Sequence, residues 1–104
     1  MKRIFLAIAS IAAGFLISTP ALADLQLATA KNCMACHAAA TKLVGPSYKE
    51  VAAKYAGQKD AVDKLSAKII KGGSGTWGPV PMPANAQVTP DEAKKLAAWV
   101  LTQK

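Results

Sequence analysis

The sequence predicts an all-α domain of about four short helices, and three observations support this fold class. Apolar residues recur at the spacing of one helix face in four separate stretches. Each stretch opens with a residue that caps helices well, and glycine or proline separates one stretch from the next. No stretch shows a convincing strand pattern of alternating apolar and polar residues.

Residues 1–23 are expected to be a secretory signal peptide outside this domain. Residues 1–3 supply a positive start, residues 4–17 form an apolar run, and a small-x-small pattern then ends at Ala23. The apolar run is shorter than the roughly 20 residues that span a bilayer, so no stable membrane insertion is expected, with an uncleaved anchor as the alternative. Cleavage after Ala23 would leave residues 24–104 as the folded domain in the periplasm.

A first helix is predicted for about residues 25–33, with Asp24 as its N-cap. Its apolar stripe consists of Leu27, Ala30 and Met34. The next two residues after Ala30, Lys31 and Asn32, are expected to face away from the core. The helix leads directly into a group of cysteines and a histidine.

Residues 33–37 read Cys-Met-Ala-Cys-His, which is the C-x-x-C-H pattern of c-type haem attachment. The thiols of Cys33 and Cys36 can each add across one vinyl group of a haem and so form two thioether bonds. Side chains three positions apart on a helical turn lie on nearly the same side, so both sulfurs can reach one haem. The adjacent His37 is then held close to the iron and can serve as its proximal ligand.

Three other interpretations of this pattern fit the chain less well. A redox-active disulfide between Cys33 and Cys36 requires a thioredoxin-like alternation of strands and helices. A structural zinc site requires about four ligands, whereas the chain holds two cysteines and one histidine. His37 could also be an ordinary surface histidine. A domain this small usually needs a further source of stability, and a covalently bound haem would supply it.

A turn is predicted at Gly45-Pro46, after a short connection. A histidine that binds haem iron needs its other ring nitrogen tethered, usually to a carbonyl or a carboxylate. The carbonyl of Pro46 could provide this tether for His37. The alternative is that the proline only marks the turn.

The second helix is predicted to start at a capping box formed by Ser47 and Glu50 and to end at Gly57. Its two tyrosines, Tyr48 and Tyr55, are expected to pack in the core and against the haem rather than to relay electrons.

The third helix is predicted to start near Asp60 and Asp63, where the helix dipole favours carboxylates, and to stop at Gly72-Gly73. Lys68 lies in its last turn. Its apolar side consists of Val62, Leu65, Ile69 and Ile70.

Residues 72–88 contain four glycines and three prolines, which exclude regular structure over this stretch. A long irregular loop in a small domain is usually either functional or disordered. Trp77, Val80 and Met82 favour function, because disorder would leave these apolar side chains unburied. The prolines on both sides of Met82 stiffen the backbone around it.

Met82 is the expected sixth ligand of the iron, since a thioether sulfur suits a haem that carries electrons. The alternative is a methionine that only fills a gap in the core. Trp77 has an indole N–H that needs a partner when buried, which could be a haem propionate or a backbone carbonyl. Asn85 could bond to the loop backbone or to the ligand sulfur.

The last helix is predicted to start at Thr89, with Pro90 as its first residue and Glu92 completing a capping box. Its apolar face is formed by Ala93, Leu96, Ala97, Val100 and Leu101, with Trp99 beside Leu96. We expect this helix to cross the first helix near Leu27 and Ala30, where the small alanines allow a close approach.

The segment 24–104 has 11 basic residues, all of them lysines, against 6 acidic ones, which gives a formal net charge of +5 at pH 7. This charge favours redox protein partners with an acidic docking surface and fast electrostatic steering. Nucleic acid is not expected, because bidentate reading of bases favours arginine. The alternative role for many of these lysines is to keep helix faces in solvent. A carrier of this size is expected to be a monomer.

The segment 24–104 resembles the short bacterial class I cytochromes c, which are soluble periplasmic carriers with one haem. The matching stretches, in that family's order and spacing, are CMACH, VGPSYKEVAAKYAG, GGSGTWGPVPMPANA and DEAKKLAAWVLTQK. The resemblance implies a class I cytochrome c fold, with about four helices around one covalently attached haem c. It also implies thioethers at Cys33 and Cys36, with His37 as the proximal ligand and Met82 as the distal ligand.

The same resemblance implies roles for three more residues. The carbonyl of Pro46 would orient His37, and Trp77 would bond to a propionate. Lys68 would lie near the propionates, where lysine is a weaker clamp than arginine. Relatives of this kind carry electrons between respiratory partners, such as a cytochrome bc1-type donor and a nitrite reductase or terminal oxidase.

The predicted function is therefore electron transfer without catalysis. One alternative is a small haem peroxidase or ligand sensor with an open sixth site, which requires Met82 to be free. Against a peroxidase, the segment 24–104 has no second histidine and no arginine to cleave peroxide. The other alternative is a thiol oxidoreductase that uses Cys33 and Cys36.

Overall fold

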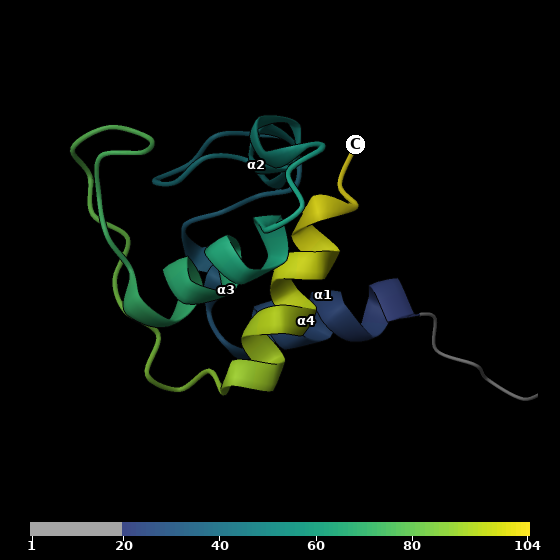
Figure 1. The fold of residues 1–104 in the computed structure, drawn as a ribbon. Helices are drawn as coiled ribbons and strands as arrows, with labels where there is room; N and C mark the ends of the chain where they lie inside the picture. Colours follow the sequence, from purple (N-terminus) through teal and green to yellow (C-terminus); the bar gives the residue numbers. More distant parts are fainter. Residues whose placement is uncertain (1–19) are drawn as a thin grey trace, which may run out of the picture.

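The computed structural model describes residues 20–104 of the chain. The predicted signal peptide lies outside the described residues over 1–19. The elements are α1 (Pro20–Ala30), a 3-10 helix η1 (Cys33–Ala35), α2 (Tyr48–Tyr55), α3 (Ala61–Lys71) and α4 (Pro90–Leu101) (Figure 1). The predicted all-α fold class is confirmed. Within the described part, the β-type pairing is a single isolated bridge between Gly73 and Met82.

The first helix differs from the prediction at both ends. α1 begins at Pro20, so Asp24 lies inside the helix rather than at its N-cap, and it ends at Ala30 rather than near residue 33. Asn32 then takes up the left-handed conformation, with φ of 63°. Asparagine tolerates this conformation better than most residues. The helix is therefore interrupted before the haem motif, and Cys33 to Ala35 form a separate 3-10 turn.

Local capping signals explain where α2 and α4 begin. The Ser47 hydroxyl accepts a hydrogen bond from the Glu50 N–H at 3.1 Å, and the Ser47 N–H donates to the Glu50 carboxylate at 3.0 Å. Thr89 and Glu92 make the same pair of bonds at the start of α4, at 3.2 and 3.0 Å. Both predicted capping boxes are present, and each satisfies two backbone N–H groups that the helix leaves free.

The helix α3 has weaker local signals at its start. Asp60 occupies the N-cap position but makes no capping bond from its side chain. Its carboxylate instead lies 3.4 Å from the ammonium group of Lys64. Gly72 follows the helix with φ of 67°, so the predicted stop at the glycine pair is correct.

The helix α4 lies at the centre of the fold and contacts α1, α2 and α3 (Figure 1). The helices α4 and α1 are in contact, and the fully buried alanines of the two helices, at 0 % exposure, are Ala28 in α1 and Ala93 and Ala97 in α4. The predicted crossing of these two helices is correct, but the predicted contact residue Ala30 is wrong, because Ala30 is exposed. The buried face of α1 is centred on Leu27 and Ala28, since the helix ends before the stripe can continue to Met34.

Lys31 lies outside the apolar core, as predicted, but it has polar partners that the sequence did not indicate. Its ammonium group lies 3.4 Å from the Glu92 carboxylate and donates to the Gln87 carbonyl at 2.9 Å. The Gln87 amide donates in return to the Lys31 carbonyl at 3.2 Å. Lys31 therefore ties the end of α1 to the segment that leads into α4. Within residues 20–104, none of the helices combines the length and apolar character needed to cross a bilayer.

Candidate haem site

A cavity of about 510 Å³ lies between the motif of residues 33–37, the helices α2, α3 and α4, and the loop 72–88. This volume is in the range of sites for small molecules and cofactors. Its wall includes all eight residues that the sequence singled out: Cys33, Cys36, His37, Pro46, Lys68, Trp77, Met82 and Asn85. Most of the remaining wall is apolar, including Val51, Leu65 and Leu96. Residues far apart in the sequence thus meet around one cavity.

Three neighbours hold the imidazole of His37. Its Nδ1 lies 2.7 Å from the carbonyl oxygen of Pro46. Because a carbonyl only accepts, Nδ1 carries the proton, and Nε2 keeps a free lone pair for a metal. The ring of Tyr48 stacks on the imidazole with a centroid distance of 5.4 Å. Gly45 approaches so closely that a Cβ there would lie 2.5 Å from Cε1 of His37.

Gly45 is a site residue that the sequence analysis missed. The sequence marks it as part of a turn, which it is. Its contact with the imidazole depends on how residues 36–46 fold back: the Gly45 N–H donates to the Cys36 carbonyl at 2.8 Å. One sequence signal could have suggested this contact: Gly45 directly precedes Pro46, whose carbonyl is the expected partner of His37.

The two cysteines are half-buried free thiols on the same short turn. The His37 N–H donates to the Cys33 carbonyl at 3.1 Å, which fixes the spacing of the motif. Burial raises the pKa of the Cys33 thiol. Reactive thiols of oxidoreductases have the opposite property, a lowered pKa that gives a thiolate.

Tyr48 is buried in the cavity wall, as predicted for a packing residue. Its ring meets Trp99 edge-on, with a centroid distance of 5.1 Å. Burial, together with the neighbouring Cys33 and Cys36, raises the pKa of Tyr48 well above its ordinary value. The phenol therefore stays neutral at physiological pH. The burial of Tyr48 and its edge-on contact with Trp99 agree with a packing role.

Met82 lies half-buried in the loop 72–88, which runs out from the end of α3 and returns to the start of α4 (Figure 1). Its N–H donates to the Gly73 carbonyl at 2.8 Å, and its carbonyl accepts from the Gly73 N–H at 3.0 Å. The side-chain amide of Asn85 donates to the Ile69 carbonyl at 2.8 Å and to the Pro83 carbonyl at 3.4 Å. The two partners expected for Asn85 were the loop backbone and the ligand sulfur, and in the structure its amide donates to backbone carbonyls.

Trp77 and Lys68 line the same cavity, but their exposure differs. Trp77 is 43 % exposed, and the ammonium group of Lys54 lies 5.3 Å from its ring centroid. Lys68 is half-buried, and its ammonium group lies next to Gly73. The cation–π contact of Lys54 was not predicted, because nothing in the sequence distinguishes Lys54 from the other lysines of the helices.

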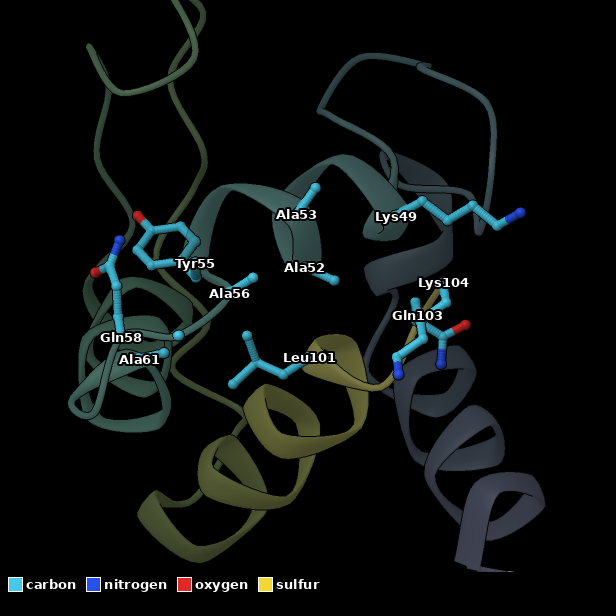
Figure 2. A pocket seen from close by; sticks show the side chains of 11 residues that line it. Lys49, Ala52, Ala53, Tyr55, Ala56, Gln58, Ala61, Leu101, Gln103 and Lys104 are labelled. Atoms are coloured by element: carbon cyan, nitrogen blue, oxygen red, sulfur yellow. The ribbon is translucent and has the colours of Figure 1, made fainter.

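A second hollow of about 440 Å³ lies between α2 and the C-terminal end of α4 (Figure 2). Figure 2 shows that its floor consists largely of alanines and Leu101, with Lys49 and Lys104 at one end. No histidine, cysteine or methionine is among the described residues that line it. It therefore offers no ligand for a haem.

The donor set of the first cavity fits a c-type haem. It combines two thiols, an imidazole whose free nitrogen is Nε2, and a thioether, within an apolar wall. It does not fit a structural metal ion, because the described residues contain no group of three or more His, Cys, Asp and Glu side chains that could hold one. The fold and site thus define a small all-α protein built to hold one haem.

The chain belongs to the cytochrome c family, whose model matches residues 25–104. It is 61% identical to a cytochrome c-552 from Hydrogenobacter thermophilus, over 79% of this chain and 83% of the relative. It is 49% identical to a cytochrome c-551 from Stutzerimonas stutzeri, over 100% of both chains. It also resembles the crystal structure of Nitrosomonas europaea cytochrome c552, with a TM-score of 0.75 and 51% identity, over 77% of this chain and 99% of that one. The chain is therefore an electron carrier with one covalently attached haem c.

Proposed function

We propose that this chain is a periplasmic electron-transfer protein in which His37 and Met82 are the two axial ligands of the haem iron. The bound haem supplies an iron that alternates between the ferrous and ferric states. The observation that carries the proposal is that both side chains line one cavity and both are held by the backbone, His37 through Pro46 and Met82 through Gly73. Two protein ligands leave no coordination position for a substrate.

The other residues of the cavity hold and shield the group. Cys33 and Cys36 would anchor it through thioether bonds, on the turn that also carries His37. Apolar side chains of α3 and α4, such as Leu65 and Leu96, exclude water from its faces. Lys68 and Trp77 would meet its propionates, where a cation and an N–H donor are both useful.

The reduction potential tests the proposed ligation. Methionine paired with histidine raises the potential of a haem, so Met82→His should lower it by on the order of 0.1 V. Met34→Leu is the matched control, because Met34 packs against the core and does not line the cavity. An unchanged potential in Met82→His, measured by redox titration of the haem-loaded protein, would show that Met82 is not a ligand.

We propose a carrier rather than a peroxidase or a ligand sensor. A peroxidase needs an open iron position and a distal group that helps to break the peroxide bond. His37 is the one histidine of the chain, and its Nδ1 is already committed to Pro46. Peroxide turnover by the wild-type holoprotein at the rate shown by Met82→Ala would contradict this proposal.

We propose that redox partners dock where the connection before Pro46 and the loop 72–88 border the cavity. Leu43, Val44 and Val80 are 49, 60 and 61 % exposed, and Val44 and Val80 line the cavity. Lys42 lines it as well, so an apolar patch has a positive neighbour. A partner with an acidic rim, such as a bc1-type donor, a nitrite reductase or a terminal oxidase, fits this surface. Raising the salt concentration should slow oxidation by such a partner, and rates independent of salt would argue against lysine steering.

We also propose that export removes residues 1–23. Cleavage after Ala23 would cut inside the first two turns of α1 and leave Asp24 near its new start, where a carboxylate favours the helix dipole. The mass of the exported protein tests this proposal directly. It should equal residues 24–104 plus one haem, and a mass that includes residue 1 would contradict cleavage.

A further inference from the structure

The last turn of α3 and the loop that carries Met82 meet through backbone atoms at Gly72. Gly72 has φ of 67° and ψ of −160°, a combination that is essentially restricted to glycine. A Cβ at this position would collide with the Met82 carbonyl oxygen and lie 2.7 Å from the carbonyl carbon of Pro83 and 2.8 Å from the nitrogen of Ala84. No side chain fits at Gly72 unless the Met82 segment moves.

The hydrogen bonds around Met82 lead to the same turn. Met82 and Gly73 exchange two backbone bonds, at 2.8 and 3.0 Å. Three residues later, the Asn85 N–H donates to the Ile70 carbonyl at 3.2 Å, and the Asn85 side chain donates to the Ile69 carbonyl at 2.8 Å. Carbonyls in the last turn of a helix lack partners within the helix, and Asn85 supplies them here. The segment 82–85 is therefore fastened to residues 69–73.

We propose that Gly72 is a positioning residue for Met82. The missing side chain lets the Met82 segment lie directly against the last turn of α3, and this close approach sets the place from which the sulfur binds the iron. Gly72 does not line the cavity, so its influence passes through the backbone of Met82. The inference rests on the proposed ligation by Met82.

Cyanide binding to the ferric holoprotein measures this influence, because cyanide competes with the Met82 sulfur for the iron. The apparent affinity of such a ligand scales with the fraction of molecules in which its position is open. Gly72→Ala displaces the Met82 segment and raises this fraction, so the cyanide affinity should rise about tenfold or more. The far-red absorption band from sulfur to ferric iron should weaken in parallel.

Gly78→Ala is the matched control. Gly78 lies in the same loop with φ of 111°, but a Cβ there would meet nothing within 4 Å. It also lies outside the cavity wall. Both variants thus place alanine at a strained backbone position, and only Gly72→Ala pushes on Met82. We expect Gly78→Ala to bind cyanide as the wild type does. Equal cyanide affinities of the two variants would overturn the inference.

Two further results separate the possible failures. If the wild-type holoprotein lacks the far-red band, the ligation by Met82 fails, whatever Gly72 does. If Gly72→Ala yields no haem-loaded protein, amide hydrogen exchange in the wild-type ferrous holoprotein decides. The Gly73 and Met82 amides should then be protected as strongly as the Lys71 amide in α3. Exchange of both as fast as the Val80 amide would overturn the inference.

Discussion

The imidazole of His37 is constrained from three directions before any metal binds it. The Pro46 carbonyl fixes the tautomer, the Tyr48 ring covers one face, and Gly45 touches the ring edge. Each constraint lowers the freedom that the side chain must lose when Nε2 binds the iron. Such preorganisation of a metal-binding histidine by its outer partners is typical of metal sites.

Gly45→Ala should therefore disturb the iron–imidazole bond. The new methyl group would lie 2.5 Å from Cε1 of His37, so the ring or the loop must shift. We expect a larger high-spin fraction in the ferric absorption spectrum and a loss of about 1–3 kcal/mol in the free energy of unfolding. Gly57→Ala is the control for the spectrum alone: a Cβ there would meet nothing within 4 Å, but the φ of 77° strains alanine and costs stability by itself. A wild-type spectrum for Gly45→Ala would rule out this steric role.

Among single residues, the chemical role of a side chain or carbonyl could be predicted from the sequence, whereas close contacts between residues could not. The Pro46 carbonyl was considered as a tether because a ligating histidine needs one, and this hydrogen bond is present in the structure. The contact of Gly45 with the ring, and that of Lys54 with Trp77, result from chain reversals that bring distant residues together. No local pattern encodes the distance between such residues.

The start of α4 shows how one element can carry a pH dependence. The Glu92 carboxylate accepts from the Thr89 N–H at 3.0 Å and lies 3.4 Å from the ammonium group of Lys31. The bond from the Thr89 backbone, with smaller contributions from the Thr89 hydroxyl and Lys31, holds the pKa of Glu92 below its ordinary value of 4.5. The ionised carboxylate is therefore favoured in the folded protein.

Glu92→Gln should destabilise the holoprotein at neutral pH and have less effect in acid. A carboxyl group with a lowered pKa contributes stability above its unfolded pKa, and this contribution is lost as the pH falls through the folded pKa. Glutamine keeps the capping bond but not the charge. Urea unfolding from pH 7 down to pH 3 should show the two proteins converging below about pH 4.5. A difference that stays constant over this range would exclude the charge as its cause.

The starts of α2 and α4 were predictable because their capping signals are local, whereas the two ends of α1 were not. A capping box needs only residues four positions apart or fewer, so Ser47 and Thr89 mark α2 and α4 correctly. The end of α1 depends on Asn32, whose left-handed conformation turns the chain into the haem motif. The apolar spacing of Leu27, Ala30 and Met34 suggested a continuous helix, but Met34 reaches the core through a turn instead.

At the scale of the whole fold, α4 is the helix that α1, α2 and α3 all contact. It packs against α1, and both helices carry completely buried alanines: Ala28 in α1, and Ala93 and Ala97 in α4. Protein cores are packed densely, so a completely buried alanine leaves no room for a longer side chain. The haem motif follows α1, so this crossing also sets where the motif lies relative to α4.

Ala97→Leu should therefore cost stability, while Ala98→Leu should not. Ala97 is fully buried, and its neighbour Ala98 is exposed on the same helix. Overpacking a dense core costs about 1–3 kcal/mol. The free energy of unfolding, measured by denaturant titration of the two holoproteins, compares the same substitution with and without burial. Equal stabilities would show that the core around Ala97, which also lines the haem cavity, is not tightly packed.

The sequence predicted the global arrangement only in part. Helical periodicity and caps gave the fold class, and the resemblance to class I cytochromes c gave the group around which the helices fold. The crossing of the first and last helices was expected, but one of its contact residues was wrong, because the end of α1 changes which face is buried. Contacts such as that of Lys31 with Gln87 and Glu92 require knowledge of the packed arrangement itself.

The central claim is that His37 and Met82 together bind one haem iron, and the far-red absorption spectrum of the oxidised holoprotein tests it most directly. A ferric iron bound by a thioether sulfur gives a weak band in this region. Ligation by Met82 predicts the band in the wild-type protein and in Met34→Leu, and its loss in Met82→Ala. A wild-type spectrum without this band, or a band that persists in Met82→Ala, would contradict the account.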